Sequence, residues 1–146
     1  MITTIKLSIY GLLIRDQKVL ISSEEYKGHH LVKYPGGSVE YGEGLHQALI
    51  REWEEEVQVE IEIGSLIYLT EDFLPSAFRK ERQIVSFYYQ VFTDAPIIGR
   101  KTEHEVRWLP LDQSVEKTNF TFPLDRKIFK ILQERFLMNP GSEPIV

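Results

Sequence analysis

The chain has 146 residues, of which 42% are hydrophobic and 27% are charged, and these values are ordinary for a folded domain. The length predicts one domain over residues 1–146, and the net charge of −5 argues against nucleic acid as a partner. The chain contains no cysteine, which excludes disulfides and a cysteine nucleophile and fits a reducing compartment. No apolar run approaches the ~20 residues of a membrane-spanning helix, and the first residues lack the pattern of a signal peptide. We therefore expect a cytoplasmic protein without a membrane partner.

Strand-forming residues dominate the first part of the chain. Residues 3–14 are rich in apolar and β-branched side chains and predict a strand, and residues 19–21 predict a second strand that completes a hairpin. Residues 22–30 are polar and predict a loop. Residues 31–34 predict a further strand, which ends at the turn signal Pro35-Gly36-Gly37.

Residues 44–57 predict an acidic amphipathic helix. Its apolar stripe follows helical spacing and consists of Leu45, Ala48, Leu49 and Trp53. At about 100° per residue, Glu52 and Glu56 lie beside this stripe and Glu55 lies at its edge, whereas Glu54 points to solvent. Like charges one turn apart cost about 0.2–0.5 kcal/mol per pair. A divalent cation would turn that cost into affinity, because such ions prefer oxygen ligands.

More strands and a second helix follow. The predicted elements are one or two strands in residues 59–70, a loop in 71–82, a strong strand in 83–92, a loop in 94–100, a short strand in 106–109 and a helix in 124–137. Pro123 suits the first turn of that helix. Strands that alternate with two helices predict an α/β fold in which helices cover both faces of one mixed sheet.

The spacing of residues 37–59 is the most specific signal in the chain. Gly37 is followed by five residues and Glu43, and then by seven residues and the run Arg51-Glu52-Trp53-Glu54-Glu55-Glu56. This stretch resembles the Nudix box, written G-x5-E-x7-R-E-U-x-E-E-x-G-U, where U is a bulky aliphatic residue. Trp53 replaces the aliphatic residue, and Gln58 replaces the closing glycine. If position 58 requires a left-handed backbone, a residue other than glycine costs roughly 1 kcal/mol there.

The resemblance implies a fold and a set of roles. The fold is a Nudix-type α/β/α sandwich with a mixed β-sheet between helices, and the reaction is Mg²⁺-dependent hydrolysis, with Mn²⁺ as the alternative metal. The implied metal ligands are the carbonyl of Gly37 and the carboxylates of Glu52, Glu55 and Glu56. Glu43 and Arg51 form a structural pair. Glu52 is our first choice of general base, and Glu103 or Glu105 is the alternative base or an additional metal ligand.

The resemblance leaves the substrate open. It implies a nucleoside diphosphate linked to another group, and a nucleoside triphosphate or similar nucleotide is our first choice. An ADP-ribose or nucleotide-sugar pyrophosphatase is the alternative, which Pro75, sixteen residues after the box, weakly favours. A non-catalytic nucleotide-sensing module is the second alternative. Candidate substrate contacts are Arg15, Tyr34 and Arg82, and a homodimer is the commonest assembly to expect.

Overall fold

Two long parallel strands form the centre of the molecule. The computed structural model describes residues 1–98 and 104–137. Strand β1 (Thr4–Arg15) pairs with β6 (Arg82–Phe92) from Thr4 opposite Arg82 to Leu13 opposite Val91. The other elements are β2 (Lys18–Tyr26), β3 (His29–Lys33), β4 (Gly36–Ser38), α1 (Leu45–Glu56), β5 (Glu62–Leu69), β7 (Glu105–Pro110), η1 (Val115–Lys117) and α2 (Pro123–Phe136).

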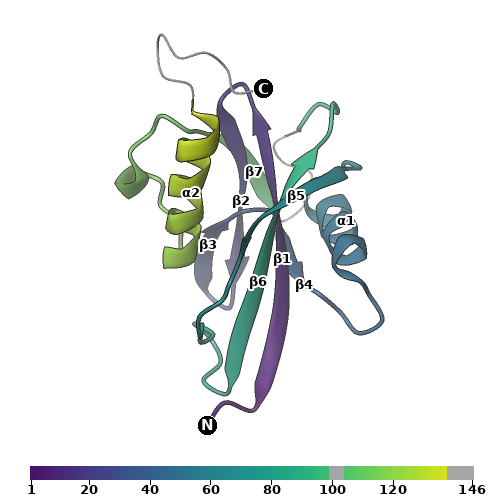
Figure 1. Cartoon of the computed structure of the whole chain (residues 1–146), viewed down its shortest axis with the longest axis vertical. Coiled ribbons are helices and arrows are strands. Elements are labelled where there is room, and N and C mark those ends of the chain that lie inside the picture. Colours follow the sequence, from purple (N-terminus) through teal and green to yellow (C-terminus); the bar gives the residue numbers. More distant parts are fainter. Residues whose placement is uncertain (99–103, 138–146) are drawn as a thin grey trace.

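The helices lie on opposite sides of the strands (Figure 1). The hydrogen-bonded strand order is β3-β2-β1-β6-β5, while β4 pairs with β1 and β7 pairs with β2. The β1–β6 pair is parallel and the other pairs are antiparallel, so the sheet is mixed. This arrangement confirms the predicted α/β/α sandwich. Within the described ranges, no helix is long and apolar enough to cross a membrane.

The loop predicted over residues 22–30 is wrong. Strand β2 continues to Tyr26 and β3 begins at His29, so only Lys27 and Gly28 form the turn. Both turn residues have positive φ, at 49° and 78°, as the favoured two-residue hairpin turns require. The polar side chains that suggested a loop belong to a strand whose backbone groups pair with β3. Likewise, the predicted turn after Pro35 leads into the short strand β4 (Gly36–Ser38).

Trp53 anchors α1 to the sheet. Its side chain is fully buried, and its Nε1 donates to the carbonyl of Pro35 at 3.2 Å. A Cβ on Gly11 would lie 2.4 Å from that Nε1, so β1 has a glycine where the indole packs. The prediction that Trp53 faces the core is therefore confirmed. A second core lies on the other side of the sheet, where α2 packs its buried Ile128, Phe129 and Leu132.

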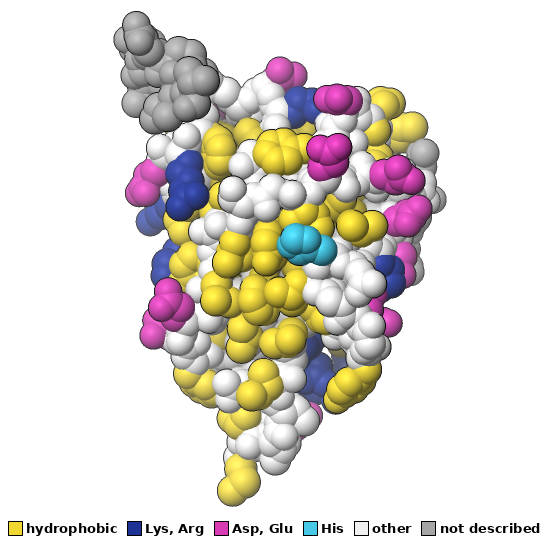
Figure 2. Space-filling view, turned by 45° about the vertical axis from the view of Figure 1, so that its right-hand side comes forward, with side chains coloured by type: hydrophobic (Ala, Val, Ile, Leu, Met, Phe, Trp, Pro, Cys, Tyr) yellow, Lys and Arg dark blue, Asp and Glu magenta, His cyan; other side chains and the backbone are white. Residues whose placement is uncertain are grey.

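Helix α1 covers only part of its face of the sheet. Ile5 and Leu7 share this face with the buried Ile9, because alternate residues of a strand point the same way. Ile5 nevertheless remains 64% exposed. Figure 2 shows the resulting gathering of hydrophobic side chains, with acidic side chains mainly around its edges.

Helix α1 ends in a left-handed residue. Gln58 has φ of 63°, and its backbone N–H donates to the carbonyl of Trp53 at 2.9 Å. This confirms the condition under which replacement of the closing glycine carries a conformational cost.

Candidate active site

The acidic side of α1 borders a cleft of about 380 Å³. Its floor is formed by Lys6, Ser8 and Tyr10 of β1 with Arg82 and Ile84 of β6. These residues share one face of the sheet, because the parallel register places Lys6 opposite Ile84 and alternate residues point the same way. The cleft is completed by the carboxylates of α1, the glycine-rich strand β4, the ends of β2 and β3, and residues 76–79.

The glycines of β4 allow the backbone to approach α1 closely. Gly36 has φ of +152°, and a Cβ there would lie 2.1 Å from the carbonyl oxygen of Ile9. A Cβ on Gly37 would lie 2.7 Å from Cδ of Glu52. Gly36 meets backbone and therefore requires glycine, whereas a side chain at position 37 would have to displace the end of the Glu52 side chain. The result is a backbone segment in direct contact with a carboxylate of the predicted metal site.

Arg51 connects the loop before α1 to the carboxylates of the helix. Its Nε and Nη2 donate to the two carboxylate oxygens of Glu43 at 2.7 and 3.0 Å, and Nη2 also donates to the carbonyl of Ser38 at 3.0 Å. These hydrogen bonds lower the pKa of Glu43 and raise that of Arg51. The predicted structural pair is confirmed. Bidentate contacts of this kind fix geometry as well as charge.

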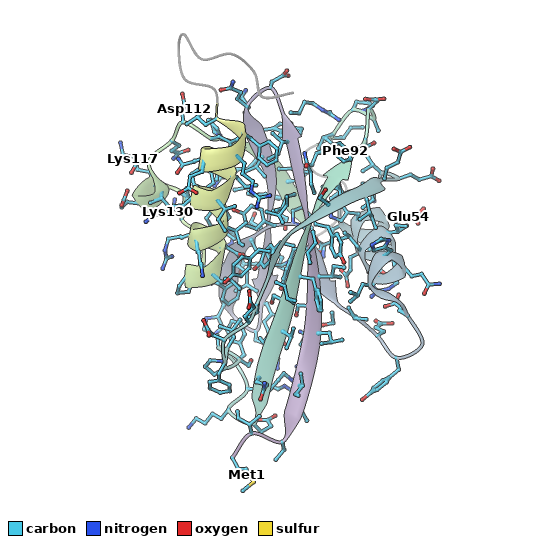
Figure 3. The ribbon with its side chains drawn as sticks, viewed as in Figure 1. Met1, Glu54, Phe92, Asp112, Lys117 and Lys130 are labelled. Atoms are coloured by element: carbon cyan, nitrogen blue, oxygen red, sulfur yellow. The ribbon has the colours of Figure 1, made fainter. Side chains whose placement is uncertain are left out.

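Glu52 and Glu55 share the remaining side of the same guanidinium. Arg51 Nη1 lies 3.1 Å from Glu52 Oε1 and 3.3 Å from Glu55 Oε2. The side chain of Glu52 is 14% exposed and that of Glu55 is 60% exposed. Burial raises the pKa of Glu52, and the charge of Arg51 opposes the rise. Glu54 points away from the cleft on the outer side of α1, as predicted (Figure 3).

Glu56 is buried against a lysine that sequence reasoning did not single out. Lys33 Nζ lies 3.5 Å from Glu56 Oε1, and the backbone N–H of Gly36 donates to Glu56 Oε2 at 3.2 Å. Burial raises the pKa of Glu56, although Lys33 opposes the rise. Burial by itself would lower the pKa of Lys33, but the charge of Glu56 and further acidic neighbours hold it above its ordinary value. Lys33 thus supplies a counter-charge inside the cleft.

Comparison with known proteins now decides the family. Residues 5–130 match the NUDIX domain family. The chain belongs to the Nudix family. The enzyme class that we predicted, a hydrolase of diphosphate bonds, is the class to which this family assigns the chain.

Several solved structures share the fold of this chain at low sequence identity. The ORF135 protein of E. coli has a TM-score of 0.74 and 19% identity, with 96% of each chain covered. The MutT protein from Methanosarcina mazei Go1 has a TM-score of 0.73 and 16% identity, over 92% of this chain and 96% of that one. The MutT NUDIX hydrolase from Burkholderia pseudomallei has a TM-score of 0.71 and 18% identity, over 88% and 98%. A comparison with curated proteins gave no match.

The Nudix carboxylates have the chemistry of a hard-cation site. Glu52, Glu55, Glu56 and Gly37 line the same cleft, and oxygen donors of this kind suit Mg²⁺ or Mn²⁺. In residues 1–98 and 104–137, no three acidic or histidine side chains stand close enough together to form a finished metal site. In the structure, Arg51 contacts Glu55 and Lys33 contacts Glu56. The donors are all oxygen atoms, so their chemistry fits a divalent cation.

The structure places the three predicted substrate contacts in three different environments. Arg82 lines the cleft. The prediction for Tyr34 is wrong, because its side chain is fully buried and its hydroxyl donates to the backbone carbonyl of Asp125 at 3.1 Å. Arg15 does not line the cleft: its guanidinium donates to the carbonyls of Thr93 and Ala95 and lies over the ring of Trp108.

Of the two alternative base residues, Glu105 is described by the structure and Glu103 is not. Glu103 lies outside the described residues, and Glu105 is an exposed residue of β7 that does not line the cleft. Its neighbour His104 does line it, with Nδ1 3.2 Å from Oε2 of Glu24. Sequence reasoning missed this pair, because Glu24 fell in the region predicted as a loop.

An apolar side cavity of about 200 Å³ opens from the cleft. The residues common to both are Tyr10, Ala77, Ile84 and Phe122. Asp125 also lines this cavity, and its carboxylate accepts a hydrogen bond from the hydroxyl of Tyr88 at 2.8 Å. Burial raises the pKa of Asp125 to about 7. An apolar cavity with few polar groups is a common form of binding site for a planar ring.

Proposed function

We propose that this Nudix protein is a Mg²⁺-dependent pyrophosphohydrolase whose substrate is a nucleoside diphosphate linked to another group. A nucleoside triphosphate is the first choice of substrate, and ADP-ribose or a nucleotide sugar is the alternative. The observation that carries the proposal is the meeting of three helix carboxylates with Gly37 at one cleft. The adjoining apolar cavity supports a nucleotide, because it suits the base while the cleft suits the phosphates.

The residues of this chain have distinct roles in the proposed reaction. Glu52, Glu55, Glu56 and the carbonyl of Gly37 would hold Mg²⁺, or Mn²⁺ in its place. A bound divalent cation neutralises charge on the diphosphate oxygens and lowers the pKa of bound water. Arg51 keeps Glu52 in place, and Glu43 keeps Arg51 in place.

Hydrolysis requires a base beside the attacking water. In our proposal Glu52 accepts a proton from that water, and the water oxygen forms a bond to phosphorus. The bond from phosphorus to the bridging oxygen breaks, and the electron pair leaves with the bridging oxygen. Burial already raises the pKa of Glu52, which makes its carboxylate a stronger base than an exposed one. Glu103 and Glu105 remain the alternative bases.

The test is an activity screen over the common nucleoside triphosphates, ADP-ribose and nucleotide sugars in the presence of Mg²⁺, in which the nucleotide products are measured by chromatography. Glu52→Gln and Glu56→Gln should each reduce kcat by at least about 100-fold. Glu54→Gln is the matched control, because it removes the same charge from the solvent side of the same helix. Turnover of none of these compounds, or equal rates in all three variants, would refute the proposal.

Two properties complete the proposal and have simple tests. We propose a cytoplasmic location, because the lack of cysteine fits a reducing compartment, and fractionation of cells that express the chain would test it. A homodimer is our expectation for assembly, and light scattering on the purified protein would measure its mass in solution.

A further inference from the structure

Two cationic side chains project from neighbouring strands onto the floor of the cleft. Lys6 lies on β1 opposite Ile84, and Arg82 lies two residues before Ile84 on β6, so both point to the same face. Strand spacing places their Cα atoms about 8 Å apart. Arg79, on the segment that follows residues 76–78, also lines the cleft.

These two cations differ from Lys33, which is neutralised by Glu56. In the described part of the chain, neither the Lys6 nor the Arg82 side chain forms a hydrogen bond or an ion pair. Lys6 is partly buried, and its pKa is lowered first by burial and then by the charge of Arg82. Arg79 lies 3.7 Å from the half-exposed Glu81, a contact of a kind that contributes little. The cations thus repel one another within a cleft, and an anion placed between them would relieve this repulsion.

The position of the cations along the strands relates them to the rest of the site. Tyr10 and Ile84 border the apolar cavity, Ile9 pairs with Gly37 beside Glu52, and Lys6 lies further along β1. Lys6 pairs with Ile84 at the mouth of the cavity, and Arg82 lies two residues from Ile84 on β6, so both cations lie on the floor between the cavity and the open part of the cleft. A ligand with its ring in the cavity and its diphosphate at the carboxylates would therefore have the cations within reach of a further anionic group.

We propose that Lys6 and Arg82, assisted by Arg79, bind an anionic group of the substrate that lies beyond the nucleoside diphosphate. This inference rests on the proposed function and deepens it. It specifies a nucleoside triphosphate, whose terminal phosphate is charged, over substrates in which the diphosphate carries a neutral sugar. Lys6 and Arg82 are then specificity-determining residues and take no part in the chemical step.

A simpler role for Lys6 is to balance the charge of Glu52. That charge partly opposes the lowering of the pKa of Lys6 by burial and Arg82. The two roles predict different kinetics. If Lys6 only balances Glu52, its loss should slow the hydrolysis of every substrate by the same factor. If Lys6 binds a terminal phosphate, its loss should affect nucleoside triphosphates alone.

The experiment compares kcat/KM for ATP, GTP, CTP, UTP and ADP-ribose in the variants Lys6→Met, Arg82→Met and the double variant. For the nucleoside triphosphates we expect a loss of at least about tenfold per substitution, mainly through KM, because each removes a charged hydrogen bond. For ADP-ribose we expect a change below about threefold. Lys130→Met is the matched control, since it removes one exposed positive charge from α2 at a position that does not line the cleft (Figure 3).

A binding measurement separates this inference from the proposed function. Inorganic tripolyphosphate is titrated calorimetrically into wild-type protein and the double variant in EDTA, with thermal melting as the check on folding. Binding that is at least about tenfold weaker in the double variant supports the cation site even if no nucleotide is hydrolysed. Equal binding, or equal loss of kcat/KM for triphosphates and ADP-ribose, overturns the inference and leaves the hydrolase proposal standing. The variants Lys6→Arg and Arg82→Lys keep the positive charges, so we expect them to recover part of the binding that the Met variants lose.

Discussion

Replacement of Gln58 by glycine should stabilise the protein. Gln58 follows the C-terminus of α1 with φ of 63°, and its side chain is exposed. A residue with a Cβ is strained in this left-handed conformation by about 1–2 kcal/mol, whereas glycine is not. The substitution therefore removes strain without removing a buried contact. The backbone hydrogen bond from Gln58 to Trp53 is retained, because it does not involve the side chain.

The expected gain is modest because glycine also makes the unfolded chain more flexible. That flexibility costs about 0.5–1 kcal/mol, which leaves a net gain of about 0.7 kcal/mol at the middle of both ranges. The entropy of unfolding of a 146-residue chain is about 0.3 kcal/mol per kelvin. The midpoint of thermal unfolding should therefore rise by about 2–3 °C.

Differential scanning calorimetry on wild type, Gln58→Gly and Gln58→Ala measures the effect. Alanine keeps the Cβ and so should leave the midpoint within about 1 °C of wild type. Glu54→Gly is a second control, because glycine in the exposed middle of the same helix should lower stability by about 1 kcal/mol. An unchanged or lowered midpoint in Gln58→Gly would refute the strain argument.

Three further predictions concern buried or crowded groups. The folded-state pKa of Asp125, about 7, lies above the unfolded value of 3.8, so unfolding releases a proton between these values and stability should fall as pH rises from about 4 to 7. The fall should reach at most about 4 kcal/mol, and urea unfolding at several pH values should show it in wild type and not in Asp125→Asn. Gly37→Ala should displace the Glu52 carboxylate and reduce kcat by more than about tenfold, while calorimetry shows a nearly native midpoint. Lys33→Met should destabilise the fold by about 3–5 kcal/mol in urea unfolding, because it leaves Glu56 buried without its counter-charge, and adding Glu56→Gln should recover part of the loss.

Helix α1 could be predicted from the sequence because its signal is local. Residue spacing along a helix determines which side chains share a side, so Glu52 and Glu56 could be placed beside the apolar stripe and Glu54 on the solvent side. The pairing of Glu43 with Arg51 followed from the family pattern. The possibility of a left-handed backbone at Gln58 could also be raised from the sequence, because the family pattern has glycine at this position.

Only the tertiary structure decided which distant residues complete the cleft. Lys33, Lys6 and Arg82 come from three different strands, and their meeting depends on the pairing register of β1 with β4 and β6. The sequence of a strand shows which side chains alternate between its two faces. It does not show which strand will pair with it or which face another element will cover. For the same reason Tyr34, a plausible substrate contact by residue type, lies instead in the core beside α2. The family pattern in the sequence therefore indicated the class of bond, while the long-range pairing of strands determined which charges surround the cleft.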